Sequence, residues 1–192
     1  TIDRLKSKYS EKIADHEKND FSKSLLIIGK QIKQIENLVN EFSDFARMPK
    51  PILKDNNLVS LIKDNIKLLN ELDNKIIIDF KTRKSSILLN SDSEQISRVF
   101  FNLIKNSIES IQDKIIDDVN LIGKIDISLN ENVEKINFII IDNGIGFGIF
   151  VDNIKNILNP YFTTKKKGSG LGLSIVNKII NDHNGKINFV SL

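Results

Sequence analysis

Residues 167–174 (KGSGLGLS) form the pattern in this sequence that is best suited to binding phosphate. Three glycines, Gly168, Gly170 and Gly172, alternate with small or apolar residues, and a helical pattern follows at once. Glycine lets backbone amides approach a ligand without a Cβ in the way, and amides at a helix N-terminus attract phosphate oxygens. Such a turn is weak evidence alone, so its interpretation depends on the motifs that precede it.

Two asparagines, Asn102 and Asn106, lie four residues apart in a segment with helical spacing. Residues four apart share a helix face, so both amides can offer oxygens to a hard cation such as Mg²⁺. Lys105 and Asn106 could then meet phosphate oxygens beside the cation. The alternative is a solvated face in an asparagine-rich sequence. Glu109 could be proposed as a base, but a solvated helix residue is the simpler interpretation.

Residues 139–148 (IIIDNGIGFG) read as a buried strand that runs into an aspartate and a series of glycines. A carboxylate at a strand end, such as Asp142, can accept a hydrogen bond from an exocyclic amine. Gly144 and Gly146 would let a flat ring pack on the backbone. The alternative is a glycine-rich turn that the aspartate caps.

Residues 159–167 (NPYFTTKKK) are polar and basic around one aromatic residue, Phe162. This composition is typical of a mobile lid that closes over a polyanion, although a solvated loop is the alternative. No glycine–lysine pair is followed by Ser or Thr, and no glycine run has the GxGxxG spacing. The sequence therefore argues against P-loop and Rossmann nucleotide sites.

The composition narrows the class of protein. The 192 residues include no cysteine, which excludes disulfides and thiolate metal sites. A net charge of +3 is spread along the chain, so we expect no nucleic-acid partner. No apolar stretch approaches the ~20 residues that span a bilayer. The sequence opens inside an amphipathic segment and stops inside an expected strand, so we expect an excised piece of a longer protein.

The elements that must position these motifs fall into two domains. A helical stripe over residues 21–47 ends at Pro49 and Pro51, which places a boundary there. Residues 1–50 are expected to form a helical hairpin, truncated at its N-terminus, with a polar connection over residues 9–20. The hairpin would pair with a second copy into a four-helix bundle or, alternatively, pack on its own globular domain.

Residues 51–192 mix helices and strands, so we expect an α+β protein whose second domain is a two-layer α/β sandwich. Its last strand would be missing. The expected helices cover residues 58–72, 92–116, 149–158 and 171–183. The expected strands cover residues 76–80, 87–89, 122–129, 136–141 and 186–190.

The order of the motifs is more specific than any one of them. NLIKNSIES, DNGIGF, PYFTT and GSGLGLSIV follow one another along the chain. Over about residues 51–192 this order resembles the ATP-binding domain of sensor histidine kinases in the GHKL superfamily, named for gyrase, chaperone, kinase and mismatch-repair ATPases. The preceding EFSDFARMPKP resembles the nitrogen-regulation subgroup of these kinases.

The resemblance implies ATP and Mg²⁺ as cofactors and gives each motif a role. Asp142 would bind the adenine amino group in a pocket shaped by Gly144 and Gly146. Asn106 would ligate Mg²⁺, and Asn102 and Lys105 would act as catalytic residues near the phosphates. The lid and the glycine run would supply the other nucleotide-binding residues: Phe162, Thr164, Lys165, Gly168, Gly170, Leu171 and Gly172.

One position distinguishes the members of this superfamily. Where this sequence has Asn102, the ATP-hydrolysing relatives carry a glutamate that activates water as a general base. An amide cannot take up a proton, so Asn102 favours a kinase over a hydrolytic ATPase. A degenerate kinase that only docks partners is the other alternative, and the intact motifs argue against it.

A histidine kinase also needs a phosphoacceptor histidine within a His-Glu-x-x-Asn-Pro-type motif, and this sequence lacks that motif. His183 precedes Asn184-Gly185 and is expected to be structural, whereas His16 falls in the polar connection. We therefore expect the acceptor upstream of Thr1.

The implied protein is the cytoplasmic core of a two-component sensor histidine kinase. Mg-ATP would phosphorylate the histidine, and a response-regulator aspartate would receive the phosphate. The resemblance further implies a homodimer, and a full-length protein held in the bacterial inner membrane by segments outside this sequence.

Overall fold

The computed structural model describes residues 2–9, 12–72, 75–147, 154–165 and 168–190. These divide into two compact units, residues 1–48 and 49–192. Each unit has its own packing and is described by itself.

The first unit consists of two helices, α1 (Ile2–Tyr9) and α2 (Asp15–Ala46). With 32 residues, α2 is about 48 Å long at 1.5 Å per residue. The helix begins six residues earlier than its apolar stripe predicted, so His16 lies in its first turn and the expected polar connection is shorter. Glu17 in the first turn favours a helix N-terminus through the helix dipole, so a helix start here carries no apolar stripe in the sequence.

An apolar stripe follows α2. Leu25 is buried where α1 lies alongside, and Gly29 there approaches Ile2. From Ile28 onward five large apolar side chains recur at spacings of four and three, each 48–59% exposed: Ile28, Ile32, Ile35, Val39 and Phe42. This is the spacing of a helix that pairs with other helices in a coiled coil or bundle.

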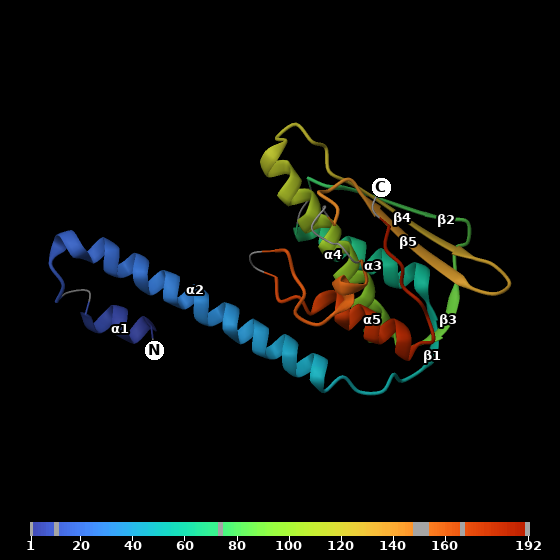
Figure 1. The fold of residues 1–192 in the computed structure, drawn as a ribbon, viewed down its shortest axis with the longest axis horizontal. Helices are drawn as coiled ribbons and strands as arrows, with labels where there is room; N and C mark the ends of the chain where they lie inside the picture. The colour runs from blue at the N-terminus through green and yellow to red at the C-terminus, as the bar shows by residue number, and fades with distance from the viewer. Residues whose placement is uncertain (1, 10–11, 73–74, 148–153, 166–167, 191–192) are drawn as a thin grey trace. The chain divides into compact units, whose positions relative to one another are not determined.

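The second unit is the expected two-layer sandwich of helices on a sheet (Figure 1). Its three-stranded sheet has the order β2 (Ile77–Thr82), β4 (Lys124–Glu131) and β5 (Ile136–Asp142). β2 is parallel to β4, and β4 is antiparallel to β5. A separate antiparallel pair joins β1 (Lys54–Asn57) to β3 (Leu88–Ser91).

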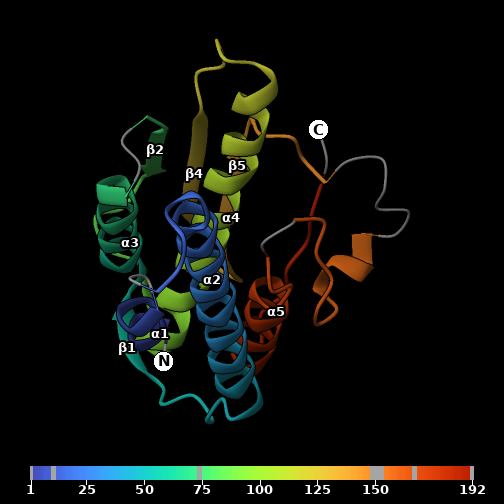
Figure 2. The ribbon, with the colours of Figure 1, turned by 90° about the vertical axis from the view of Figure 1, so that its left-hand side faces the viewer.

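Three helices, α3 (Leu58–Leu72), α4 (Ser93–Asp117) and α5 (Gly172–Asp182), form the other layer with a short 3₁₀ helix, η1 (Ile154–Leu158). α4 packs between α3 and α5 and runs along β4 and β5, while α3 lies beside β2 (Figure 2). The core therefore centres on α4, and this helix also carries the asparagine pair.

Alternation along β4 decides which face of the sheet receives the helices. Ile125, Ile127 and Leu129 are fully buried, while Lys124 and Asp126 point to the other face and pair with each other. On α4 the fully buried side chains are Ile104 and Ile111, again on the sheet side.

Two expected elements differ from the structure. No strand forms over residues 186–190; instead the ring of Phe189 packs edge-on against Phe147, with centroids 5.5 Å apart. A side-chain contact thus holds this segment where alternation alone suggested a backbone ladder. The helix expected over residues 149–158 is only a 3₁₀ turn from Ile154, and residues 149–153 lie outside the described residues.

Asp92 caps the start of α4. Its Oδ1 accepts hydrogen bonds from the backbone N–H groups of Glu94 at 3.1 Å and Gln95 at 3.0 Å. Its Oδ2 accepts from the Ile52 N–H at 2.9 Å. Burial raises the pKa of Asp92, but the hydrogen bonds from Ile52, Gln95 and Glu94 outweigh it, so the pKa lies below its ordinary value of 3.8.

His183 links the end of α5 to the same cap. Its Nε2 accepts a hydrogen bond from the Asp92 N–H at 3.0 Å, and its Nδ1 lies 2.8 Å from the Ile179 carbonyl oxygen, to which it donates. Both ring nitrogens are thus engaged by the backbone. The expectation that His183 is structural is confirmed.

We expect the substitution Asp92→Ala to lower the free energy of unfolding by about 1–2 kcal/mol at neutral pH, as the loss of an N-cap does elsewhere. The ionised carboxylate is the form that accepts these hydrogen bonds. Its contribution is therefore present above the ordinary aspartate pKa and is lost as the pH falls through the lowered folded-state pKa. Urea unfolding at neutral and acidic pH measures the difference in free energy of unfolding between wild type and Asp92→Ala. If that difference stays constant with pH, the ionised carboxylate is not what caps the helix.

Candidate functional site

The asparagine pair lies at the point where α4 meets the start of α5. Asn102 donates a hydrogen bond from Nδ2 to the Arg98 carbonyl at 2.9 Å. Its Oδ1 lies 3.4 Å from where a Cβ on Gly172 would stand. Asn106 follows one turn later on the same face and is partly buried. The structure thus brings together Asn102 and the glycine run, which are 70 residues apart in sequence.

The loop after β5 packs directly on α4. Asp142 ends the strand, and its Oδ1 accepts a hydrogen bond from the Gly144 N–H at 3.0 Å. A Cβ on Gly144 would overlap the Ser110 side chain and lie 2.8 Å from the Ile111 nitrogen. Only glycine therefore lets this loop lie against the helix, one turn beyond Asn106. Gly146 has φ +67°, a left-handed conformation that glycine adopts readily.

Two residues that the sequence analysis missed hold this loop. Lys114 donates from Nζ to the carbonyl oxygens of Asn143 at 2.9 Å and Gly144 at 3.2 Å. The Asn143 side chain accepts from the Lys124 N–H at 2.8 Å and donates to the Ile122 carbonyl at 2.9 Å. The spacing of Lys114, eight residues after Asn106, was the signal that could have placed it near the same face of α4.

The loop that begins at Tyr161 is joined to the glycine run by the backbone. The Tyr161 N–H donates to the Gly170 carbonyl at 3.0 Å, and a Cβ on Gly170 would lie 2.5 Å from the Tyr161 carbonyl carbon. Gly170 has φ +70°, so both its conformation and its surroundings require glycine. Gly168 in turn approaches Thr163 Oγ1, which accepts from the Lys165 N–H at 3.1 Å.

The remaining predicted residues of this region take different positions. Phe162 is partly buried next to the exposed Tyr161, and Thr164 is exposed. The Leu171 side chain is buried in the core, and its N–H donates to Ser169 Oγ at 3.2 Å. Any contact of Leu171 with a nucleotide would therefore have to come from the backbone.

The charged side chains of the site form one cluster. Glu109 Oε2 accepts a hydrogen bond from Lys165 Nζ at 2.5 Å, and Oε1 lies 3.8 Å from Lys105 Nζ. Glu109 is a helix residue with a side chain 35% exposed, as the interpretation of a solvated helix residue expects, but both of its oxygens also face lysines. The cluster places two cations beside the asparagine pair.

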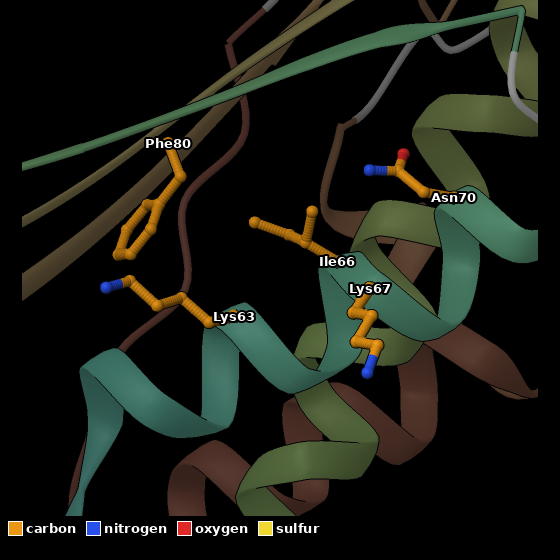
Figure 3. A pocket seen from close by; sticks show the side chains of 5 residues that line it. All are labelled: Lys63, Ile66, Lys67, Asn70 and Phe80. Carbon is orange, nitrogen blue, oxygen red and sulfur yellow. The ribbon is translucent and has the colours of Figure 1, made fainter.

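A separate hollow of about 510 Å³ lies between α3 and β2. It is lined by Lys63, Ile66, Lys67, Asn70 and Phe80, and Figure 3 shows the Lys63 side chain directed toward the Phe80 ring. None of these residues belongs to the motifs, so this hollow is distinct from the candidate site.

Among the described residues, no helix combines the length and the apolar character that a membrane span requires.

Residues 91–191 match the family described as "Histidine kinase-, DNA gyrase B-, and HSP90-like ATPase". This range contains all four motifs and more than half of the chain. The chain belongs to this ATPase family. The ATP-binding superfamily that the motif order predicted is thereby confirmed.

Bacterial sensor histidine kinases are among the relatives that the chain resembles in sequence. The chain is 33% identical to an NtrY-like sensor histidine kinase of Rickettsia prowazekii, over 98% of this chain and 30% of that protein. It is 32% identical to the nitrogen regulation protein NtrY of Azorhizobium caulinodans, over 97% of this chain and 24% of that protein. The chain thus spans about 30% or less of the length of these relatives.

Solved structures of the family have the same fold. The histidine kinase ThkA, in complex with the response regulator protein TrrA, has a TM-score of 0.67 and 25% identity, over 96% of this chain and 50% of that one. The ThkA catalytic domain alone has a TM-score of 0.57 and 32% identity, over 68% of this chain and 81% of that one. The similarity to the complex covers both units of this ATPase-family chain.

Proposed function

We propose that residues 49–192 bind Mg-ATP and act as the catalytic domain of a sensor histidine kinase. In this proposal the γ-phosphoryl group passes to a histidine and then to an aspartate of a response regulator. The observation that carries it is the meeting of three motifs on one face of α4. Asn102 lies at the start of α5, Asn106 follows one turn later, and the Asp142 loop packs one turn beyond that.

The adenine end of the site would be the Asp142 carboxylate. One of its oxygens accepts from the Gly144 N–H, while the other receives no hydrogen bond from the described residues. That second oxygen can accept from the exocyclic amino group of adenine. Lys114 and the close packing of Gly144 on α4 keep the loop in place, so the acceptor is preorganised.

The phosphate end would lie between α4 and the start of α5. The described residues contain no group of three acidic, histidine or cysteine side chains that could hold a metal ion. The partly buried Asn106 fits Mg²⁺ nevertheless, because this ion keeps several waters and is held by few protein oxygens together with substrate phosphates. Bound there, Mg²⁺ would neutralise charge on the phosphates. The N-terminus of α5 and the two lysines of the charged cluster would supply further positive potential.

Transfer, rather than hydrolysis, follows from the chemistry of Asn102. Its amide cannot take a proton from water, and its Nδ2 is already committed to the Arg98 carbonyl. His183 is engaged through both ring nitrogens, and His16 lies in the first turn of α2 without an acceptor motif. We therefore assign neither histidine as the phosphoacceptor.

Calorimetric titration of the chain with ATP tests the proposal. We expect one ATP per chain in the presence of Mg²⁺, and a loss of affinity of at least several-fold when EDTA removes the metal. GTP is the matched control, because guanine presents a carbonyl oxygen where adenine presents the amino group, and that oxygen would face the Asp142 carboxylate. The absence of binding heat with Mg-ATP, or equal binding of GTP, would overturn the assignment.

The first unit would serve as the dimerisation element. The half-exposed stripe from Ile28 to Phe42 has bundle spacing, and among the described residues α1 lies along the first half of α2, where Ile2 approaches Gly29. We infer that a second copy supplies the missing helices of a four-helix bundle.

A further inference from the structure

Glu109 is an acidic residue among groups that would meet phosphate. It lies three residues after Asn106 on α4, so it shares the face that carries the asparagine pair. Its Oε2 accepts from Lys165 Nζ at 2.5 Å, and its Oε1 lies 3.8 Å from Lys105 Nζ. Both lysines belong to the set that the motifs assign to the nucleotide.

The pair with Lys165 is among the less exposed ion pairs of the described residues, together with Lys178–Asp182, whose side chains are 38% and 32% exposed. The Glu109 and Lys165 side chains are 35% and 30% exposed, whereas those of Lys33 and Glu36 are 68% and 56% exposed. Less solvent screening strengthens a charge pair. The pair also joins residues 56 apart in sequence and ties the loop after Tyr161 to α4.

We propose that the Glu109 carboxylate is paired with the Lys165 ammonium group when no nucleotide is bound, and that the polyphosphate of a nucleotide displaces Glu109 from Lys165. Glu109 then competes with the nucleotide phosphates for Lys165. It lowers the affinity for nucleotides, and it lowers it most for those with the most phosphate groups. This inference rests on the proposed function, because it requires that ATP binds here.

The physical reason is the balance of charge. Two lysines and one glutamate give the cluster a net charge of +1. A polyphosphate that approaches Lys165 is attracted by the ammonium group and repelled by the carboxylate beside it. Its binding must therefore break or weaken the Glu109–Lys165 pair. Removal of the carboxylate charge removes both this competition and the repulsion. The resulting increase in nucleotide affinity grows with the number of phosphates.

The test is calorimetric titration of the full chain with ATP, ADP and AMP. We expect Glu109→Gln to tighten ATP binding by about two- to fivefold, the range that a charge pair about a third exposed supports. The gain should be smaller for ADP and close to none for AMP. Lys165→Gln should weaken ATP binding, and in that background Glu109→Gln should give a smaller gain in ATP affinity than in wild type, because only the direct repulsion between carboxylate and phosphate is then removed. Glu109→Asp, which keeps the charge but withdraws it from Lys165, should lie between wild type and Glu109→Gln.

Asp182→Asn is the matched control. Asp182 pairs with Lys178 on α5 at 3.0 Å with a side chain 32% exposed, ten residues beyond Gly172. The same change of carboxylate to amide there should leave ATP affinity unchanged.

Three results would overturn the inference. The first is weaker ATP binding by Glu109→Gln, and the second is an increase in AMP affinity equal to the increase in ATP affinity. The third is that Glu109→Gln increases ATP affinity as much in the Lys165→Gln background as in wild type. If wild-type protein binds no ATP, the proposed function itself fails. If wild type binds ATP and Glu109→Gln is no tighter, only the role of Glu109 fails.

Discussion

Replacement of Asp142 by asparagine should lower the affinity for ATP by about 100-fold or more. The asparagine Oδ1 can still accept from the Gly144 N–H, as the carboxylate does at 3.0 Å. Its Nδ2 would then face the adenine amino group, so that a donor meets a donor. A charge-assisted hydrogen bond contributes about 1.5–3 kcal/mol, and an unsatisfied donor adds about 1–3 kcal/mol. Because each 1.4 kcal/mol is a factor of ten in affinity, the sum of about 2.5–6 kcal/mol corresponds to a loss on the order of 100-fold or more.

Asp126→Asn is the control for this substitution. Asp126 lies on β4 opposite Ile141, one residue before Asp142, but on the face of the sheet away from the helices. It should leave ATP binding unchanged in the same titration. If Asp142→Asn binds ATP as wild type does, the adenine assignment is wrong, while the phosphate end of the proposed site would still stand.

The elements that carry the site could be predicted because their signals are local. The apolar spacing that ends at Ile108 and Ile111 gives α4, and the run of isoleucines before Asp142 gives β5. A buried helix face follows from periodicity within a few turns. The face that is not buried then follows as well, and Asn102 and Asn106 lie on it. The expectation that the strand is buried is wrong, because Ile139 and Ile141 are each 47% exposed and Ile141 lies opposite Asp126 on the face of the sheet away from the helices.

Contacts between distant segments could not be predicted in this way. Lys114 reaches the loop 29 residues later, and Glu109 reaches Lys165 after 56 residues. Neither pair has a local pattern, because both depend on how β5 and the loop after Tyr161 pack on α4. The helix start at Asp15 was missed for a different reason, since polar first turns carry no apolar stripe.

Gly144 shows how a correct motif can have an incomplete explanation. The sequence suggested that this glycine leaves room for a flat ring. In the structure the space beside it is occupied by the backbone and side chain of Ser110 on α4. The glycine thus lets the loop approach the helix, and the adenine acceptor Asp142 is positioned as a consequence.

The second large effect is expected in the helical unit. Ile35 lies in the middle of the α2 stripe and is 59% exposed in the single chain. In a four-helix bundle it would be buried in both copies, so that Ile35→Glu removes two buried isoleucines and places two charges in the core. Burial of one isoleucine contributes about 1.5–3 kcal/mol, and the unpaired charges add to this loss. We therefore expect the dimer dissociation constant to rise by at least about 100-fold.

Asn37→Glu introduces the same charge on the opposite side of the same helix. Asn37 is two residues away, about 200° around the helix axis at 3.6 residues per turn, and it is exposed. Sedimentation equilibrium over a range of concentrations should show Asn37→Glu as dimeric as wild type and Ile35→Glu as monomeric. ATP titration of Ile35→Glu should still show binding, because every residue assigned to the nucleotide lies in the second unit. A wild-type monomer, or an Ile35→Glu dimer of unchanged affinity, would show that the stripe has another role. Loss of ATP binding together with the dimer would instead show that the two units depend on each other.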